Sequence, residues 1–253
     1  AFICTQNLKD EDYINAHYVI MATKKGQVKK TSLEQYSRPR TNGINAITIR
    51  EGDELLEAKL TTGESQVMLA LKSGKAIRFE EAKTRPMGRG ASGVRGIKLA
   101  HDEDAVIGMI SVNDMESNIL VVSENGYGKR SSLEDYRITN RGGKGVKTIS
   151  ITDKTGHLVS IKNVTDEDDL MIINKSGIAI RMAVEDLRVM GRATQGVKLI
   201  NLKGSDSIAA VAKVMKDEEE ESDGNAAEAE GADFQSQDEN TSENNPENTQ
   251  TED

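Results

Sequence analysis

The chain has 253 residues, with 33 Lys and Arg against 42 Asp and Glu, which gives a formal net charge of -9 at pH 7. Its one cysteine excludes an internal disulfide framework and any metal site built on paired cysteines, and it fits a reducing compartment. No apolar run approaches the roughly 18 residues that a membrane-spanning helix needs, so the sequence predicts a cytoplasmic protein without a membrane partner.

The charge is divided unevenly along the chain. Fifteen of the 42 acidic residues and none of the basic ones lie in residues 217–253, which leaves residues 1–216 with 33 basic and 27 acidic residues, a net charge of +6. The acidic segment contains no Val, Ile or Leu, so it cannot bury enough apolar area to offset the entropy of ordering. We expect a mildly basic body, residues 1–216, followed by a disordered acidic tail, residues 217–253.

The chain begins with the apolar run "AFICT", residues 1–5. Because a repeat of strands follows, we interpret this run as the closing strand of a preceding unit, with Cys4 buried in it. On this interpretation the sequence is a fragment of a longer protein, and the first blades of that protein are missing.

Four segments then share one pattern: an apolar run, a polar pair with a glycine, and a second run that mixes apolar and basic residues. This pattern is typical of a β-hairpin. The turn glycines, spaced 48, 52 and 51 residues apart, are Gly26, Gly74, Gly126 and Gly177. A second glycine follows 17 or 19 residues later and opens another strand, in "NGINAITI", "SGVRGIKL", "KGVKTISI" and "QGVKLINL".

A last apolar run closes each unit of about 50 residues, and no segment keeps a helical period. Four strands per unit are typical of the blades of a propeller. The sequence therefore predicts an all-β, propeller-like fold of four-stranded blades, with about four blades present. Their predicted bounds are 17–60, 66–112, 118–161 and 169–214.

Between the hairpin and the second glycine, each unit has an arginine-rich loop without acidic residues: "SRPRTNG", "TRPMGRGASGVRG", "RITNRGGKGVK" and "RVMGRATQGVK". In a radial array these loops share one rim, so their charges would form a curved stripe that holds and bends duplex DNA by its phosphates. The loop cations predicted to bind DNA are Arg38, Arg40, Arg85, Arg89, Arg95, Arg137, Arg141, Lys144, Lys147, Arg188, Arg192 and Lys198. The hairpin strands add Lys29, Lys30, Arg78, Lys129, Arg130 and Arg181.

Other polar residues have simpler interpretations. The three histidines occupy different places in the repeat, which argues against a metal site. The acidic runs "HDED" and "TDEDD" lack the glycine and terminal glutamate of a calcium loop, so we interpret them as turns. Tyr36 and Tyr136 occupy matching places where the last unit has Leu187, which favours core packing over base stacking. We predict no catalytic residue, metal site or cofactor within this chain.

The stretches "KKGQVKKTSLEQY", "MGRGASGVRGIKL", "ENGYGKRSSLEDY" and "MGRATQGVKLI" closely resemble the C-terminal domain of DNA gyrase A, over residues 1 to about 214. In that family six blades form a β-pinwheel that wraps DNA around a basic rim. The family motif is a Gln, two basic residues and Gly-Gly-Lys-Gly, and its nearest match here is "TNRGGKG", with Thr139 and Asn140 at the first two positions. From this departure we expect the chain to bind DNA without a full wrap.

The resemblance implies a DNA-wrapping module of a bacterial, ATP-dependent type II topoisomerase, in which wrapping directs negative supercoiling. Its implied partners are duplex DNA, the rest of the gyrase A polypeptide and gyrase B, in the cytoplasm at the nucleoid, with ATP and Mg used on other domains. Two alternatives stay open. One is the C-terminal domain of topoisomerase IV, and the other is a protein-interaction β-propeller, which the 3% aromatic content and the absence of Trp disfavour.

Overall fold

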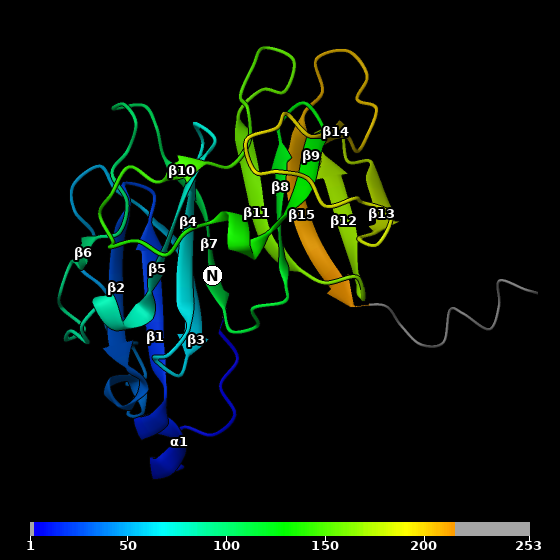
Figure 1. The fold of residues 1–253 in the computed structure, drawn as a ribbon. Coiled ribbons are helices and arrows are strands. Elements are labelled where there is room, and N and C mark those ends of the chain that lie inside the picture. Colours follow the sequence, from blue (N-terminus) through cyan, green and yellow to red (C-terminus); the bar gives the residue numbers. More distant parts are fainter. Residues whose placement is uncertain (1–2, 216–253) are drawn as a thin grey trace, which may run out of the picture. The chain divides into compact units, whose positions relative to one another are not determined.

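The computed structural model describes residues 3–215, and its regular elements are mostly strands (Figure 1). The strands are β1 (Tyr18–Thr23), β2 (Gln27–Ser32), β3 (Leu55–Thr61), β4 (Gln66–Leu71), β5 (Lys75–Glu80), β6 (Val94–Arg95), β7 (Val106–Val112), β8 (Asn118–Ser123), β9 (Tyr127–Ser132), β10 (Val146–Lys147), β11 (Leu158–Val164), β12 (Asp168–Asn174), β13 (Ala179–Ala183), β14 (Val197–Lys198) and β15 (Ile208–Met215). The helical segments are α1 (Glu11–Ala16) and the 3-10 turns η1 (Leu33–Tyr36), η2 (Glu81–Lys83) and η3 (Leu133–Asp135). The all-β prediction is confirmed, and the predicted acidic tail lies outside the described residues.

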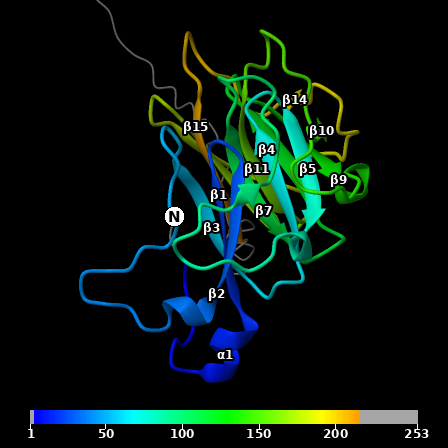
Figure 2. The same cartoon turned by 90° about the vertical axis from the view of Figure 1, so that its left-hand side faces the viewer.

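These strands form four sheets, which follow one another in chain order (Figures 1 and 2). The first sheet has the order β3-β1-β2-β6, the second β7-β4-β5-β10, the third β11-β8-β9-β14 and the fourth β15-β12-β13. The edge strands β3, β7, β11 and β15 line one cavity of about 710 Å³. Four sheets that meet at a common cavity are arranged as the blades of a propeller are.

Each of the first three sheets takes its fourth strand from the following repeat. β6 pairs with β2, β10 with β5 and β14 with β9, each in a two-residue antiparallel ladder. The prediction that one repeat supplies all four strands of its own sheet is therefore wrong. After its hairpin the chain crosses to the preceding sheet, where the backbone N–H of Met87 donates to the carbonyl of Lys30 at 2.7 Å in the second repeat, and equivalent bonds recur in the third and fourth.

Two sites of the repeat lack this pairing in the described part of the chain. Residues 43–49 of the first repeat, predicted as a strand, form none, and the fourth sheet has three strands because no described segment pairs with the outer edge of β13. Both differences have one cause. A fourth strand forms only where a hairpin and the crossing segment of the next repeat meet.

The second glycine of each unit is required by this exchange. Gly93 has a φ of +86°, and a Cβ atom there would lie 2.5 Å from the carbonyl oxygen of Val28 on the preceding sheet. A side chain would collide with the backbone at the point where β6 joins the sheet, and L-residues other than glycine avoid this φ. The glycine spacing read from the sequence therefore marks the crossing points between blades.

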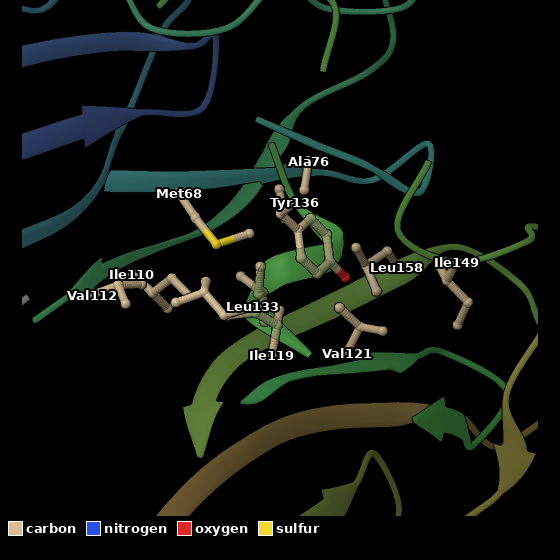
Figure 3. Packing of buried hydrophobic residues seen from close by; sticks show 12 residues of the cluster. Met68, Ala76, Ile110, Val112, Ile119, Val121, Leu133, Tyr136, Ile149 and Leu158 are labelled. Carbon is tan, nitrogen blue, oxygen red and sulfur yellow. The ribbon is translucent and has the colours of Figure 1, made fainter. Parts of the chain in front are cut away.

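Three of the four apolar clusters found among the described residues lie between neighbouring sheets, and the fourth lies on the first sheet. One cluster combines residues of β4 and β7 in the second sheet with residues of β8 and β11 in the third, and Tyr136 lies among them (Figure 3). Tyr136 is 1% exposed, and its hydroxyl lies 2.5 Å from Thr148 Oγ1. The interpretation of Tyr136 as a core residue is confirmed, and Tyr36 packs half-buried against the cluster of the first sheet. Each blade therefore depends on its neighbour to bury its faces.

The acidic run "HDED" has a structural role. Asp104 is 4% exposed, and its carboxylate accepts hydrogen bonds from the Ser73 backbone N–H at 3.0 Å and from Ser73 Oγ at 2.7 Å, which fixes the turn between β4 and β5. Asp53 and Asp206 accept hydrogen bonds from the matching turns of the first and fourth hairpins. Within residues 3–215, no group of three or more His, Cys, Asp or Glu side chains could hold a metal ion.

The N-terminal segment differs from its prediction. Residues 3–5 are not in a strand, and Cys4 is exposed beside the cavity instead of buried. The short helix α1, capped by the Asp10 carboxylate at the backbone N–H of Tyr13, was also not expected, because six residues are too few to show a helical period. In the described part of the chain, no helix has the length and apolar character of a membrane span.

Candidate nucleic-acid interface

In the second, third and fourth repeats, the arginine-rich loop lies between the hairpin and the two-residue strand that the repeat adds to the preceding sheet. Each loop starts by running beside the second hairpin strand of that sheet, with parallel bridges between Lys30 and Pro86, Arg78 and Ile138, and Arg130 and Val189. Each ends at the exchanged strand β6, β10 or β14. These three loops are therefore held at both ends by the preceding blade, whereas the loop of the first repeat has no such attachment in the described part of the chain.

Successive loops also bind one another directly. The backbone N–H of Lys98, just after β6, donates to the carbonyl of Gly143 in the next loop at 2.8 Å. The equivalent bonds join Thr48 to Ala91 at 3.3 Å and Ser150 to Thr194 at 3.1 Å. Four loops, one from each repeat, thus form a continuous series, which we call the basic rim and define as residues 37–48, 84–98, 136–150 and 187–199.

Most loop cations of the rim are at the surface. The exposed ones are Arg38, Arg40, Arg85, Arg95, Arg137, Lys144, Lys147, Arg188 and Lys198, and the half-buried ones are Arg89, Arg141 and Arg192. Because the loops are bonded in series, these charges stand on one connected backbone surface. A connected row of cations is the arrangement that the phosphates of a nucleic acid require.

Two half-buried arginines also bind the loop before them. Arg141 donates from Nη1 to the carbonyl of Arg95 at 3.1 Å and from Nε to that of Lys83 at 3.0 Å. Arg192 donates from Nη1 to the carbonyl of Lys147 at 2.9 Å, the equivalent acceptor. A guanidinium has five N–H donors, so these bonds can coexist with a phosphate contact. They link each loop to its neighbour.

Five of the cations predicted from the hairpin strands lie inside the body. The exposed fractions are 0% for Lys29, 4% for Lys30, 8% for Arg78, 1% for Lys129 and 7% for Arg130. Segments of the next repeat contact all five of these side chains. The structure corrects the prediction for these five residues, whose charged groups are turned to internal acceptors instead of to a ligand.

The internal partners of three of these cations are carboxylates or carbonyls of the adjacent repeat. Arg78 donates from Nη1 to the carbonyls of Leu133 at 2.7 Å and Tyr136 at 3.0 Å, across the boundary between two repeats. Lys30 Nζ lies 3.6 Å from Glu81 Oε1, and Arg130 pairs with Asp166. These side chains join blades, so they shape the rim without standing on it.

Lys29 and Lys129 hold the backbone of the rim loops from inside the body. Lys29 Nζ donates to the carbonyls of Ala46 and Arg89 at 2.5 Å each, and Lys129 Nζ donates to the carbonyl of Gly191 at 2.6 Å. Burial, and to a smaller extent the charge of Arg89, lowers the pKa of Lys29 from 10.5 to about 8. Burial also lowers the pKa of Lys129 to about 8. Each ammonium thus holds a loop backbone next to an arginine of the rim.

The remaining hairpin cation, Arg181, lies at the edge strand β13. Its Nε donates to Asp169 Oδ2 at 2.7 Å, and its side chain is 31% exposed. The matching arginines of the second and third sheets are covered by a crossing loop, and no described loop covers this one. Arg181 is therefore partly engaged and stays a candidate for the interface.

Sequence reasoning missed Lys98, which is exposed and lies on the rim next to Arg95. Its backbone makes the bond from one loop to the next, so its side chain is carried on the same surface. The matching positions hold Thr48, Ser150 and Asn201, so a search for repeated cations could not find it. The stretch "GVRGIKL" mixes apolar residues with Arg95 and Lys98, and this pattern could have indicated that Lys98 is exposed on the same strand segment.

Comparison with known proteins bears on this repeated architecture. The family model described as "DNA gyrase C-terminal domain, beta-propeller" matches residues 17–62, 67–113, 117–165 and 168–215, which together make up most of the chain. The chain belongs to this family. Its sequence is 43% identical over 222 residues to the DNA gyrase A polypeptide of Staphylococcus aureus strain MRSA252, and 44% identical over 220 residues to that of strain NCTC 8325. These matches cover 87% of this chain and 24% of each relative.

Two solved structures share the fold of this chain. A structure of a DNA gyrase A C-terminal domain superposes with a TM-score of 0.72 at 25% identity, covering 81% of this chain and 68% of the other. A crystal structure of the C-terminal domain of DNA topoisomerase IV superposes with a TM-score of 0.76 at 22% identity, covering 81% and 64%. The second likeness shows the shared fold alone.

Proposed function

We propose that this chain is the DNA-binding and DNA-wrapping module of a bacterial type II topoisomerase, DNA gyrase, and that duplex DNA lies along the basic rim. The observation that carries the proposal is the series of bonds from loop to loop, which places the exposed cations of successive repeats on one connected surface. Membership of the gyrase C-terminal family supports the same function.

The rim suits phosphates better than bases. Duplex DNA carries a negative charge about every 1.7 Å of its axis, so a row of cations held by fixed loops can replace its counterions at many points. Glycines such as Gly142 and Gly143 stand among the cations, and they let the backbone come close to a phosphate oxygen. Binding through phosphates depends little on sequence. A set of blades around a common cavity presents this row on a curve, and DNA that follows the row must bend.

Within the whole enzyme, the module would present a wrapped segment to a cleavage domain elsewhere in the gyrase A polypeptide. The hand of the wrap would then make strand passage directional, with ATP and Mg used on other domains and on gyrase B. No catalytic residue of this chain enters the proposal. The expected place of action is the cytoplasm, at the nucleoid.

The first test is a salt series of duplex DNA binding by the full 253-residue chain and by the variant Arg85→Gln, Arg137→Gln, Arg188→Gln. These three exposed arginines open the second, third and fourth loops of the rim. The slope of log affinity against log salt should fall by about 0.9 for each phosphate that the variant no longer neutralises. The matched control replaces the same number of exposed cations away from the rim: Lys9→Gln, Lys175→Gln and Lys203→Gln.

A plasmid relaxed or nick-ligated with the protein bound tests wrapping separately. A change in linking number supports wrapping, and salt-dependent binding without such a change supports the binding function of the rim alone, as expected for a topoisomerase IV type of domain. Equal slopes for the rim variant and the control variant would overturn the rim as the DNA site. The absence of any binding to DNA would return the chain to the protein-interaction alternative.

A further inference from the structure

The fourth loop of the rim is held at one peptide by two side chains of the preceding blade. Lys129 Nζ donates to the carbonyl of Gly191 at 2.6 Å, and Asp135 Oδ2 accepts a hydrogen bond from the backbone N–H of Arg192 at 3.3 Å. The carbonyl and the N–H belong to the same peptide, so a lysine and a carboxylate bind both of its polar atoms. We call this pair of side chains the clamp of the fourth loop.

The second loop has an equivalent clamp in the first sheet. Lys29 Nζ donates to the carbonyl of Arg89 at 2.5 Å, and Gln35 Oε1 accepts a hydrogen bond from the backbone N–H of Arg89 at 3.1 Å. The two clamps occupy the same positions of the repeat, because β6 and β14 pair with their hairpins in one register. In both loops, the clamped backbone therefore carries the arginine that lies four residues before the crossing glycine.

The third loop lacks this clamp. The equivalent positions of the preceding blade hold Ile77, whose side chain has no donor, and Lys83, whose ammonium accepts no hydrogen bond. Ile77 is 2% exposed, and a Cβ atom at Gly143 would lie 3.5 Å from its Cδ1, so the loop packs on an apolar surface. The middle of the loop is held by the neighbouring loop instead, where the Gly142 N–H donates to the Gly96 carbonyl at 2.5 Å.

The sequences of the loops follow the same division. The clamped loops share Met-Gly-Arg, at residues 87–89 and 190–192, whereas the third loop has "TNRGGKG" at residues 139–145. Glycine restricts the backbone less than any other residue, so three glycines make the third loop the most adaptable of the three. The rim therefore combines two clamped loops with a glycine-rich loop between them.

We propose that the two clamps are positioning elements for DNA binding, which fix the backbone at Arg89 and Arg192 before DNA arrives. This inference rests on the DNA-binding function proposed above and deepens it. A segment that is ordered in advance loses less entropy when it binds, so a clamp raises the affinity for DNA although its buried lysine does not contact the phosphates. The glycine-rich third loop takes its final form when DNA binds.

Each clamp lysine is coupled to the arginine that it positions. Burial, and to a smaller extent the charge of Arg89, lowers the pKa of Lys29 to about 8. Burial is also the main cause that lowers the pKa of Lys129 to about 8, while the Asp135 carboxylate opposes this decrease and the charge of Arg192 adds to it. A phosphate that neutralises the arginine therefore favours the protonated lysine, which also makes the stronger hydrogen bond to the loop carbonyl.

The other titratable groups near the clamp lysines are tyrosines. Tyr36 donates to the Ala46 carbonyl, which Lys29 also binds, and Tyr136 lies in the field of the same two charges as Lys129. Burial raises the pKa of both tyrosines, so they stay neutral between about pH 7.5 and 9.5. Over this range the affinity for DNA should follow the clamp lysines and fall as pH rises.

The test measures duplex DNA binding by the full 253-residue chain and by the single variants Lys29→Ile and Lys129→Ile. Isoleucine is the residue that the fold accepts at this position in the second sheet. At about pH 7.5 each variant should lose about three- to tenfold in affinity and keep the salt slope of the wild type, because no phosphate contact is removed. Arg192→Gln removes such a contact and should lower the slope by about 0.9. Lys175→Gln, which removes an exposed charge away from the rim, is the control.

Two further measurements separate positioning from a general loss of structure. Hydrogen exchange without DNA should become faster in residues 187–199 of Lys129→Ile and stay unchanged in residues 84–98, and Lys29→Ile should show the reverse. When pH rises from about 7.5 to 9.5, the wild type should lose affinity for DNA, and a chain with both lysine substitutions should lose none.

The outcomes distinguish this inference from the proposed function. Lysine variants that bind DNA as tightly as Lys175→Gln, or whose loops exchange as in the wild type, would overturn the inference. If the rim variant Arg85→Gln, Arg137→Gln, Arg188→Gln still bound more weakly, the proposed function would stand. A wild type that binds no DNA would overturn the proposed function, and the role of the clamps in binding would fall with it.

Discussion

The third and fourth sheets differ in one strand, and the difference shows what the exchange does. In the third sheet β9 has a neighbour on each side, and its middle residues Gly128, Lys129, Arg130 and Ser131 are all buried. In the fourth sheet β13 pairs only with β12 among the described strands, and none of its five residues is fully buried. The hairpin sequence is similar in both. The burial of its second strand therefore comes from the next repeat along the chain.

The comparison also explains why buried cations are tolerated in the middle of the body. In the third sheet the crossing loop brings carbonyl groups to Lys129, and in the second sheet the following repeat brings carbonyl groups to Arg78. In the fourth sheet Arg181, which occupies the position of Arg78, pairs with Asp169 on its own sheet and stays partly exposed to solvent. Wherever a further repeat follows, a cation in the hairpin strand thus donates hydrogen bonds to carbonyl groups of that repeat and links the two blades.

The largest effect is expected at the crossing glycines. Gly145→Ala places a Cβ atom 2.5 Å from the Ala76 carbonyl at a φ of +71°, so β10 must leave the second sheet or shift. We expect the free energy of unfolding to fall by about 3 kcal/mol, against about 1 kcal/mol for Gly204→Ala, where only the positive φ is strained. Urea denaturation of both variants measures the difference, and an equal decrease would show that the exchanged strand contributes little.

A slightly smaller effect is expected when the interblade arginine is removed. Arg78→Met leaves the Leu133 and Tyr136 carbonyls without their donor inside the body, which should cost about 2 to 3 kcal/mol. Arg181→Met, the matched change in the fourth sheet, breaks a partly exposed pair and should cost less than about 1 kcal/mol. Chemical unfolding of the two variants side by side tests this, and a greater destabilisation at Arg181 would contradict the role assigned to the exchange.

Hydrogen exchange tests the same comparison without mutation. The amides of β13 should exchange faster than those of β9, because an edge strand opens without the rest of the body. Mass spectrometry of peptides that span residues 127–132 and 178–183 resolves the two strands. Equal protection would mean that the outer edge of β13 is covered.

The smallest effect is the pH dependence from the two buried lysines. The pKa of Lys29 and of Lys129 is about 8 in the folded chain and 10.5 ordinarily, so between these values the unfolded chain binds more protons than the folded one. The free energy of unfolding should therefore rise as pH increases from about 8 to 10, because the penalty for burying two charges is removed. Above about pH 10 the half-buried Tyr36 and the buried Tyr136 oppose this, since burial raises the pKa of both side chains.

The variant Lys29→Met, Lys129→Met should flatten this rise, and urea midpoints at about pH 7.5 and 9.5, on either side of the folded pKa, measure it. The control is Lys9→Met, Lys175→Met, whose side chains are exposed and should keep the dependence of the wild type. A rise that persists in the buried-lysine variant would assign it to other groups.

Much of the fold could be predicted because its signals are local. A turn with positive φ needs a glycine whatever lies around it, so Gly26 and its equivalents show the hairpins, and Gly93 and its equivalents show where a strand begins. Alternating apolar residues identify strands because successive side chains of a strand point to opposite faces of the sheet. The arginines of the loops were found because they recur, and exposed ones such as Arg85 and Arg137 lie on the rim as expected.

The sequence by itself determined the class of the fold, the length of the repeat and the positions of the turns, since each depends on neighbours within a few residues. Only the tertiary structure decided which sheet a crossing strand joins, because that pairing links neighbouring repeats far apart in the chain and leaves no periodic mark. The same pairing decided whether the cations of the hairpin strands are buried or exposed. From the sequence, Lys29 and Lys129 were expected to be exposed and to bind DNA. They are buried because a loop from the next repeat covers them.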